Sequence, residues 1–83
     1  MQLLRGTVVI SLAGRDKDRY LAVMSEENGY VFLADGRLRS VSEPKKKNIK
    51  HIAATKTVVY ETDLADDSLL RKAITERFGG FRR

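Results

Sequence analysis

The sequence of 83 residues contains no cysteine and only one histidine, His51. Without cysteine, neither a disulfide framework nor a thiolate zinc site can form, so burial of apolar side chains has to hold the fold together. The absence of cysteine also fits a cytoplasmic protein, because thiols are kept reduced there. Since no potential ligand stands at metal-binding spacing from His51, we expect no metal site.

Long apolar runs are missing as well. The longest cover residues 21–24 and 30–34, whereas a helix needs roughly 20 apolar residues to span a bilayer. Residues 3–6, Leu-Leu-Arg-Gly, break off too early to form the apolar region of a secretory signal. We therefore expect neither a secretory signal nor a membrane partner.

The residue patterns typical of catalysis are also lacking. The sequence has no cysteine nucleophile, no Ser–His–acid arrangement in a convincing context and no glycine-rich phosphate loop. The acidic residues gather at 61–67, where the start of a helix explains them. We therefore expect no enzyme, no cofactor and no small-molecule substrate.

Length and composition indicate one folded domain. The chain is too short for a second domain, and its hydrophobic content of 42% is ordinary for a globular protein. We expect residues 1–56 to form a small barrel. Residues 57–83 should add a linker, a helix and a short tail to the same domain.

Segments rich in β-branched and aromatic residues predict five strands, at residues 6–10, 19–25, 30–34, 37–42 and 49–54. The pairs Asn28-Gly29 and Asp35-Gly36 are each typical of a two-residue hairpin turn. Pro44 cannot donate to a sheet and should end the fourth strand, which leaves residues 45–48 as a short exposed connection. Five short strands with tight turns favour a small β-barrel.

The last third of the chain changes to a helical pattern. Apolar residues at helical spacing predict one stripe, made of Leu69, Leu70, Ala73, Ile74 and Phe78. Asp66 is the expected N-cap, and Gly79 is the residue expected to end the helix. Residues 57–62 suit either an edge strand or an extended linker, and residues 80–83 a loose tail. We expect the helix to pack on the barrel, because an isolated helix of this length is marginal in water.

Positive charge is concentrated in one stretch of the chain. Residues 37–56 hold seven basic residues and one acid, Glu43, a net charge of +6 in a chain that carries +5 overall. A local excess of this kind indicates a polyanion site, most often for nucleic acid. The alternative is a solvated loop that only keeps the protein soluble. Arg37 and Arg39 weaken that alternative, because residues two apart on a strand share one face.

Three aromatic residues fall in the predicted barrel, Tyr20, Tyr30 and Phe32. On the surface, such rings stack on unpaired RNA bases. Phe32 lies in a segment that is apolar on both faces, so we expect it in the core. By the alternation of a strand, Leu38 should also face the core.

Residues 6–24, Gly-Thr-Val-Val-Ile-Ser-Leu-Ala-Gly-Arg-Asp-Lys-Asp-Arg-Tyr-Leu-Ala-Val-Met, resemble a KOW motif, in which a strand runs through a glycine-containing basic loop into a second strand. Residues 33–36, Leu-Ala-Asp-Gly, and 44–52, Pro-Lys-Lys-Lys-Asn-Ile-Lys-His-Ile, resemble the second half of the archaeal and eukaryotic-type KOW proteins of the large ribosomal subunit and of their small stand-alone bacterial relatives. The resemblance covers roughly residues 4–55. It implies an SH3-like barrel that binds RNA, usually ribosomal RNA. Asp16 and Asp18 make the loop at 14–18 less basic than the usual KOW loop.

We therefore expect an RNA-binding protein that acts in translation or ribosome assembly, with ribosomal RNA and ribosomal proteins as partners. The main RNA contacts are expected from Arg37, Arg39, Lys45, Lys46, Lys47, Asn48, Lys50 and His51, and secondary contacts from Arg15, Lys17, Arg19 and Lys56. Lysines supply flexible point charges for phosphate, and arginines supply bidentate forks. The alternative is a protein-interaction module of the SH3-like class that uses the C-terminal helix or a barrel edge.

Several of these residues also suit a structural role. Asn48 suits either a base edge or the cap of a turn, and His51 suits either base stacking or partial burial beside two isoleucines. Arg37 and Arg39 suit either phosphate binding or the protection of an edge strand by charge.

Overall fold

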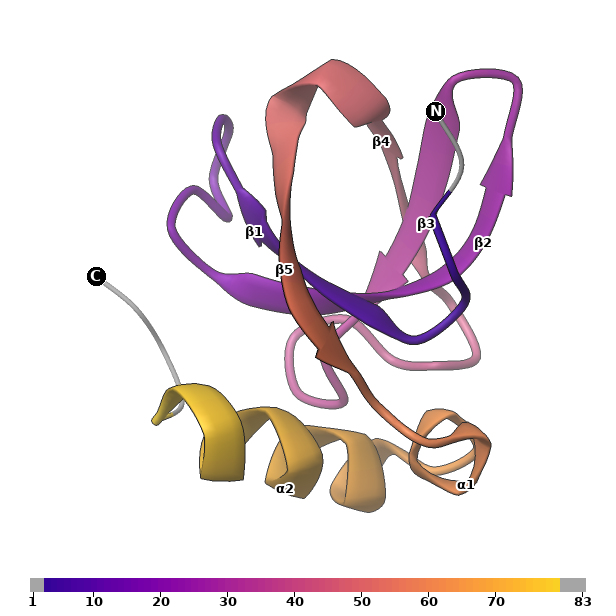
Figure 1. The fold of residues 1–83 in the computed structure, drawn as a ribbon, viewed down its shortest axis with the longest axis vertical. Coiled ribbons are helices and arrows are strands. Elements are labelled where there is room, and N and C mark those ends of the chain that lie inside the picture. Colours follow the sequence, from indigo (N-terminus) through magenta and orange to yellow (C-terminus); the bar gives the residue numbers. More distant parts are fainter. Residues whose placement is uncertain (1–2, 80–83) are drawn as a thin grey trace.

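The computed structural model describes residues 3–79 and consists of a five-stranded antiparallel sheet with a helix packed against it (Figure 1). The elements in chain order are β1 (Thr7–Ser11), β2 (Tyr20–Glu27), β3 (Tyr30–Ala34), β4 (Lys45–Asn48), the 3₁₀ turn η1 (Ile49–His51), β5 (Ile52–Val58), α1 (Glu61–Leu64) and α2 (Asp67–Phe78). The strand order is β4-β3-β2-β1-β5, so β4 and β5 form the two edges.

The sheet curves until its two edges face each other across η1, but β4 and β5 are not paired (Figure 1). The predicted fold class is confirmed as mainly β, with five strands followed by a C-terminal helix. The sheet is open, however, and does not close into a barrel. The expected tail at residues 80–83 lies outside the described residues.

Apolar side chains are buried on both faces of the sheet. Val9 packs on the face that η1 closes, in a cluster with Leu21, Val23, Val31 and Leu33. Val8 points to the opposite face and packs under the helices, in a cluster with Ala22, Met24, Ala34, Val59, Leu64, Leu70 and Ile74. Because both faces are covered, the three central residues of β1, 8–10, are all apolar instead of alternating with polar residues.

The ends of α2 follow the local sequence signals. Oδ1 of Asp66 accepts a hydrogen bond from the backbone N–H of Leu69 at 3.1 Å, as expected of an N-cap. Gly79 ends the helix in the left-handed conformation, with φ of 72°. Both predicted boundaries are confirmed.

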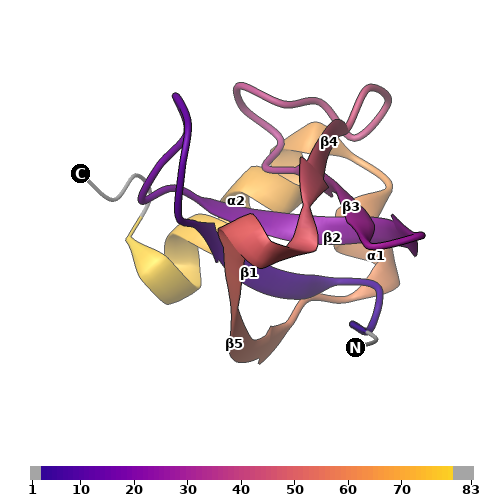
Figure 2. The same ribbon diagram turned by 90° about the horizontal axis from the view of Figure 1, so that it is seen from above.

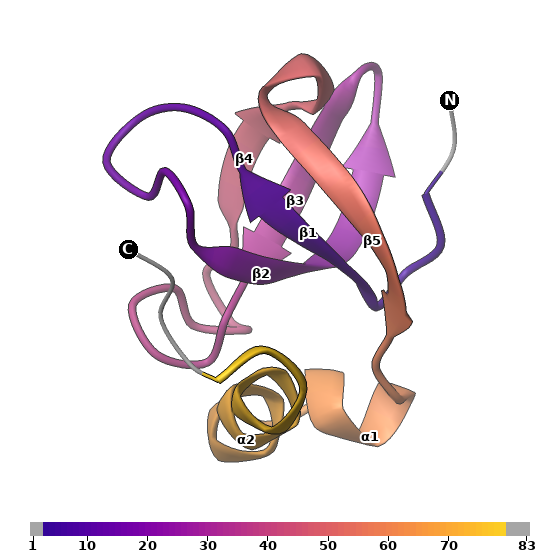
Figure 3. The same ribbon diagram turned by 60° about the vertical axis from the view of Figure 1, so that its left-hand side comes forward.

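The helix lies across the outer face of the sheet, where Figure 3 shows it end-on. Leu70 and Ile74 are buried there, and the ring of Phe78 stacks on that of Tyr20 with centroids 4.3 Å apart. The expectation that the helix packs on the sheet is confirmed. Leu69 is 45% exposed, so its assignment to the buried stripe is wrong. Leu69 precedes the buried Leu70 and lies at the margin of the contact between α2 and the sheet.

Of the two predicted hairpin turns, only the first has the expected form. Asn28 and Gly29 both have positive φ, 51° and 83°, and connect β2 to β3. Asp35 and Gly36 instead begin a wider loop, because both of their backbone N–H groups donate to the carbonyl of Arg39 at 3.0 Å. The predicted two-residue turn at 35–36 is therefore wrong.

The predicted fourth strand at residues 37–42 is also wrong, because these residues belong to the loop between β3 and β4. Leu38, expected in the core, stands in this loop and is 55% exposed. The side chain of Asp35 stabilises the loop, since its Oδ1 accepts from the backbone N–H of Arg37 at 2.8 Å and of Arg39 at 2.9 Å. These local hydrogen bonds compete successfully with strand pairing.

Residues 45–48 form an edge strand and not the exposed connection that we expected. This strand, β4, pairs with β3 from Lys45 opposite Leu33 to Asn48 opposite Tyr30. The fifth strand starts at Ile52, later than predicted, because η1 precedes it. Residues 57–62 divide between the end of β5 and the start of α1.

Neither helix within residues 3–79 combines the length and apolar character needed to cross a membrane. In the same part of the chain, no three acidic or histidine side chains gather as they would around a metal ion.

Candidate nucleic-acid interface

The pleat of β4 sends its lysines to two different sides. Lys45 and Lys47 pair with the inward-facing residues of β3, whereas Lys46 pairs with Phe32. Paired residues of an antiparallel sheet share a face. Lys45 and Lys47 therefore lie on one side of the strand and Lys46 on the other.

The inner lysines meet Asp16, which lies in the loop between β1 and β2. Nζ of Lys47 lies 2.8 Å from Oδ1 of Asp16, and Nζ of Lys45 lies 3.2 Å from Oδ2. The hydroxyl of Ser11 donates to the same Oδ1 at 2.7 Å, and Lys47 also donates to the carbonyl of Ala13 at 2.9 Å. Asp16 thus joins the β1–β2 loop to β4.

Burial and pairing act in opposite directions on the Asp16 carboxyl. Burial raises its pKa, but hydrogen bonds from Lys47, Ser11 and Lys45 favour the ionised form and lower the pKa to about 2, from an ordinary value of 3.8. Asp16 is therefore ionised at neutral pH. Its charge is compensated inside the protein by the two lysines.

This pairing changes the role of the lysine run. The side chain of Lys47 is only 8% exposed, and its ammonium is bonded to Asp16 and Ala13. Lys47 consequently cannot reach an external phosphate, contrary to the expectation that all three lysines are surface contacts. Lys45 remains partly accessible, at 27%, and Lys46 is exposed.

The β1–β2 loop is ordered by its own hydrogen bonds. The backbone N–H of Arg19 donates to the carbonyl of Asp16 at 3.0 Å, and the N–H of Asp18 donates to that of Ser11 at 2.8 Å. The N–H of Leu12 reaches the carbonyl of His51 in η1 at 2.8 Å. These bonds, together with the Asp16 pairs, hold Arg15 and Arg19 beside β4.

The β3–β4 loop is fixed from the other side, by the first residue of α2. The carboxylate of Asp67 accepts from the hydroxyl of Ser40 and from the backbone N–H of Val41, both at 2.8 Å. Gly36 lies against the backbone of Asp67 so closely that a Cβ would overlap it. The loop that carries Arg39 is thereby held on the helix.

The two loops project on the same side of the molecule (Figure 2) and enclose a cleft with a volume of about 240 Å³. Its lining holds four basic residues and two acids, with two leucines between them: Arg15, Arg19, Arg39, Lys45, Asp16, Asp35, Leu21 and Leu38. Both acids already accept internal hydrogen bonds. The cleft therefore presents a cationic surface around a partly apolar floor.

The structure thus brings together four of the predicted residues and disperses the others. Arg15 and Arg19, expected only as secondary contacts, join Arg39 and Lys45 in the cleft. The other predicted cations that are exposed lie elsewhere: Lys17 and Arg37 in the loops, Lys46 on the outer side of β4, Lys50 in η1 and Lys56 on β5. The single patch predicted from the sequence is therefore divided.

Asn48, at the end of β4, and His51, in η1, also occupy structural positions. Oδ1 of Asn48 accepts from the backbone N–H of Lys50 at 3.0 Å, so the turn-capping role is confirmed. His51 is half-buried, and its carbonyl holds the β1–β2 loop. The central position of Asp16 was missed in the sequence, because no local pattern connects it with Lys47, 31 residues away.

A second feature lies on the outer side of the β3–β4 pair. Tyr30 is 38% exposed, and Nζ of Lys46 lies 4.4 Å from the centre of its ring. Phe32 is half-buried beside them and belongs to neither core cluster, so its predicted core position is wrong. With Glu27 and Asn28, these residues line a hollow with a volume of about 300 Å³.

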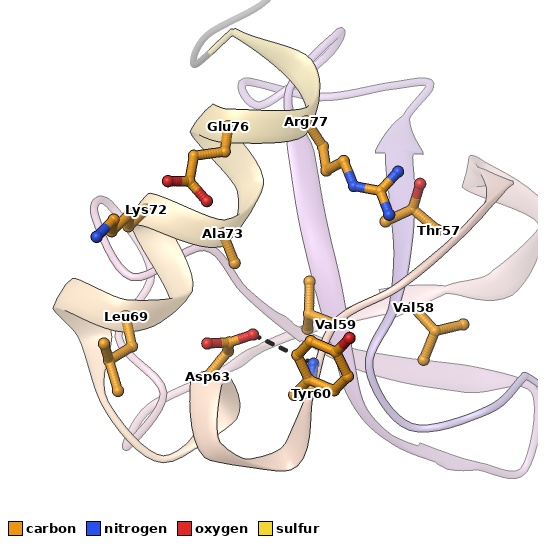
Figure 4. Close-up of a pocket in the computed structure, with 10 residues that line it drawn as sticks. All are labelled: Thr57, Val58, Val59, Tyr60, Asp63, Leu69, Lys72, Ala73, Glu76 and Arg77. Carbon is orange, nitrogen blue, oxygen red and sulfur yellow. Dashed lines mark hydrogen bonds between the residues drawn. The ribbon is translucent and has the colours of Figure 1, made fainter.

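A third hollow, with a volume of about 410 Å³, lies between β5 and α2 (Figure 4). Three exposed apolar residues stand around it, Val58, Tyr60 and Leu69. Its charges are balanced, because two basic residues and two acids line it: Lys72, Arg77, Asp63 and Glu76. A balanced lining does not favour a polyanion.

The chain matches no protein-family model, and no curated protein sequence is significantly similar to it.

Proposed function

We propose that the protein is an RNA-binding module that holds phosphate groups in the cleft between the β1–β2 and β3–β4 loops. The observation that carries this proposal is the convergence of Arg15, Arg19, Arg39 and Lys45, from two loops and a strand, on one cleft. Clustered cations on a rigid frame are the electrostatic footprint of nucleic-acid binding.

The arrangement of charges supports this role in detail. Arg15 and Arg39 are exposed, and a guanidinium can hold a phosphate with two parallel hydrogen bonds. Asp16 is paired with lysines on the protein side, and Oδ1 of Asp35 accepts two backbone N–H groups. The carboxylates are thus engaged within the protein, while Arg15 and Arg39 stay exposed at the cleft.

Salt dependence tests the phosphate contacts directly. If three or four phosphates are neutralised, the logarithm of the affinity should fall against the logarithm of salt concentration with a slope of about −2 to −4. Filter binding with a structured RNA over a range of salt concentrations measures this slope. An affinity that does not change with salt would contradict the proposal.

A pair of charge-reversal variants locates the contact. Arg39→Glu should weaken RNA binding at least tenfold, because it replaces a phosphate-binding group by a repelling one (roughly 1.4 kcal/mol or more). Lys72→Glu makes the same change of charge on the exposed side of α2 and serves as the control. Equal losses in the two variants would mean that only net charge matters and that the cleft is not the site.

The resemblance to KOW proteins supports ribosomal RNA as the ligand and translation or ribosome assembly in the cytoplasm as the setting. Sedimentation of the protein with ribosomal subunits or their precursors tests this part of the proposal. The association should disappear after ribonuclease treatment. Retention of the complex after complete RNA digestion would favour a ribosomal protein as the direct partner.

A protein-interaction module is the second candidate. It is favoured by the three exposed apolar residues around the hollow between β5 and α2 and by the outer edge of β5, with which no other strand of residues 3–79 pairs. An edge strand of this kind can accept a further strand from a partner. A Leu69→Glu variant that loses a captured partner but keeps RNA binding would support this candidate.

A further inference from the structure

The outer face of β3 is only partly covered by α2. Tyr30, Phe32 and Ala34 alternate along the strand and therefore point to the same face. Ala34 is completely buried in the cluster under the helix, whereas Tyr30 and Phe32 lie beyond it, toward the β2–β3 turn. Figure 1 shows this hairpin extending away from α2. Two aromatic rings thus stand on a face that the described residues cover only in part.

The residues around these rings are polar and suited to a nucleotide. Lys46 pairs with Phe32 across β3 and β4 and places its ammonium above the Tyr30 ring. Glu27 and Asn28 line the same hollow and carry hydrogen-bonding groups that match the edges of bases. A lysine side chain is flexible, so its ammonium can move from the ring to a phosphate. The hollow therefore offers stacking and hydrogen bonding, with one cation, Lys46, and one anion, Glu27, in its lining.

The position of β4 connects this hollow with the cationic cleft. Lys45 lines the cleft and Lys46 lines the hollow, although their Cα atoms are neighbours, about 3.8 Å apart. Among the described residues, nothing pairs with the outer edge of β4 that separates the two. A flexible RNA strand can cross this edge with a phosphate on one side and a base on the other.

We propose that Tyr30 and Phe32 form a stacking surface for an unpaired base of the RNA that the cleft holds. The inference rests on the proposed function and narrows its ligand to single-stranded RNA or to the loop of a folded RNA. The bases of a continuous duplex are stacked on one another and cannot reach the rings, whereas unpaired bases stack readily on aromatic side chains.

The test compares an oligouridine of about 12 nucleotides with a duplex RNA of equal length. Tyr30→Ala should weaken binding of the single strand by about tenfold, the effect of one lost base–aromatic stack, and leave duplex binding unchanged. Tyr30→Phe keeps the ring and should bind like the unmodified protein. Tyr60→Ala removes a tyrosine that is 78% exposed at the start of α1, outside this hollow, and serves as the control.

A fluorescence measurement covers the case in which Tyr30→Ala does not fold. The chain has no tryptophan, so a Tyr30→Trp variant reports on this position alone. Oligouridine should quench its emission, and the duplex should not. No quenching, or quenching only by a proline-rich peptide, would overturn the inference, as would equal losses for both RNAs in Tyr30→Ala. If the inference fails in one of these ways but RNA binding still depends on salt concentration and is still weakened by Arg39→Glu, the proposed function stands.

Discussion

Replacing Asp16 by asparagine should destabilise the protein, because it leaves the buried ammonium of Lys47 without a counter-charge. In the native protein that ammonium is 2.8 Å from Oδ1 of Asp16, and the two side chains are only 8% and 10% exposed. Removal of one partner from a buried ion pair is more costly than the pair itself is stabilising, since the other charge stays desolvated.

The size of the effect follows from the pKa of Asp16. Lowering that pKa from 3.8 to about 2 corresponds to about 2 kcal/mol in favour of the ionised carboxyl in the folded state. Loss of one partner of a buried pair typically costs about 3–5 kcal/mol. We therefore expect Asp16→Asn to lower the free energy of unfolding by about 2 to 4 kcal/mol, out of a total of roughly 4–12 kcal/mol for a domain of this size.

The effect should also depend on pH. Because the pKa of Asp16 is lowered in the folded protein, the contribution of Asp16 to the free energy of unfolding is fully present above pH 3.8. It disappears as the pH falls toward about 2. Urea unfolding at several pH values should show the unmodified protein losing about 2 kcal/mol more than Asp16→Asn over this range.

A matched control separates the ion pair from general effects on the loop. Asp18 stands in the same loop, with φ of 71°, and makes none of the bonds of Asp16. Asparagine tolerates this left-handed conformation, so Asp18→Asn should change the stability by less than about 0.5 kcal/mol. The pairing does not hold the loop if Asp16→Asn changes the free energy of unfolding as little as Asp18→Asn does. The same conclusion follows if the stability of Asp16→Asn falls with decreasing pH as much as that of the unmodified protein.

Three further changes test other parts of the structure. Gly36→Ala should lower the free energy of unfolding, measured by thermal unfolding, by more than about 3 kcal/mol, because the new Cβ overlaps the backbone of α2. At Gly29 a Cβ meets open space, so Gly29→Ala should lower it by only about 1 kcal/mol through backbone strain. Leu70→Ala should lower the free energy of unfolding in urea by about 2–4 kcal/mol, since the side chain is completely buried under the helix, and an unchanged value would contradict that packing. Lys47→Glu should give no folded circular dichroism spectrum, because it buries a second carboxylate beside that of Asp16. Lys46→Glu, on the exposed side of β4, should fold and bind RNA more weakly in a filter assay. A folded Lys47→Glu variant would refute the buried pairing.

Local signals predicted those parts of the fold whose determinants lie within a few residues. The Asn28-Gly29 turn needs only two residues that tolerate positive φ. The boundaries of α2 depend on the side chain of Asp66 and the conformation of Gly79. The helix packed on the sheet and four of the five strands followed from such signals together with the pattern of apolar residues, whereas the fourth strand was placed at residues 37–42 instead of 45–48.

The parts that were wrong depend on residues far apart in the chain. Lysine has a low preference for strands, so residues 45–48 were predicted to be a loop. In the folded chain they pair with β3, and Asp16 compensates the charges of Lys45 and Lys47. The position of Phe32 could not be predicted either, because the alternation of a strand does not show how much of a face a helix covers. The cationic cleft could not be predicted from local patterns either, since its arginines come from two loops that meet only in the folded chain.

The carboxylate of Asp67 makes the cleft and the helix parts of one cooperative unit. It begins α2, and it also accepts hydrogen bonds from Ser40 and Val41 in the loop that carries Arg39. Unwinding of the first helical turn therefore releases the loop, and the protected amides of both segments should exchange with solvent at a common rate. By mass action, a ligand that binds only the closed cleft must also slow exchange in α2, an element that it does not touch.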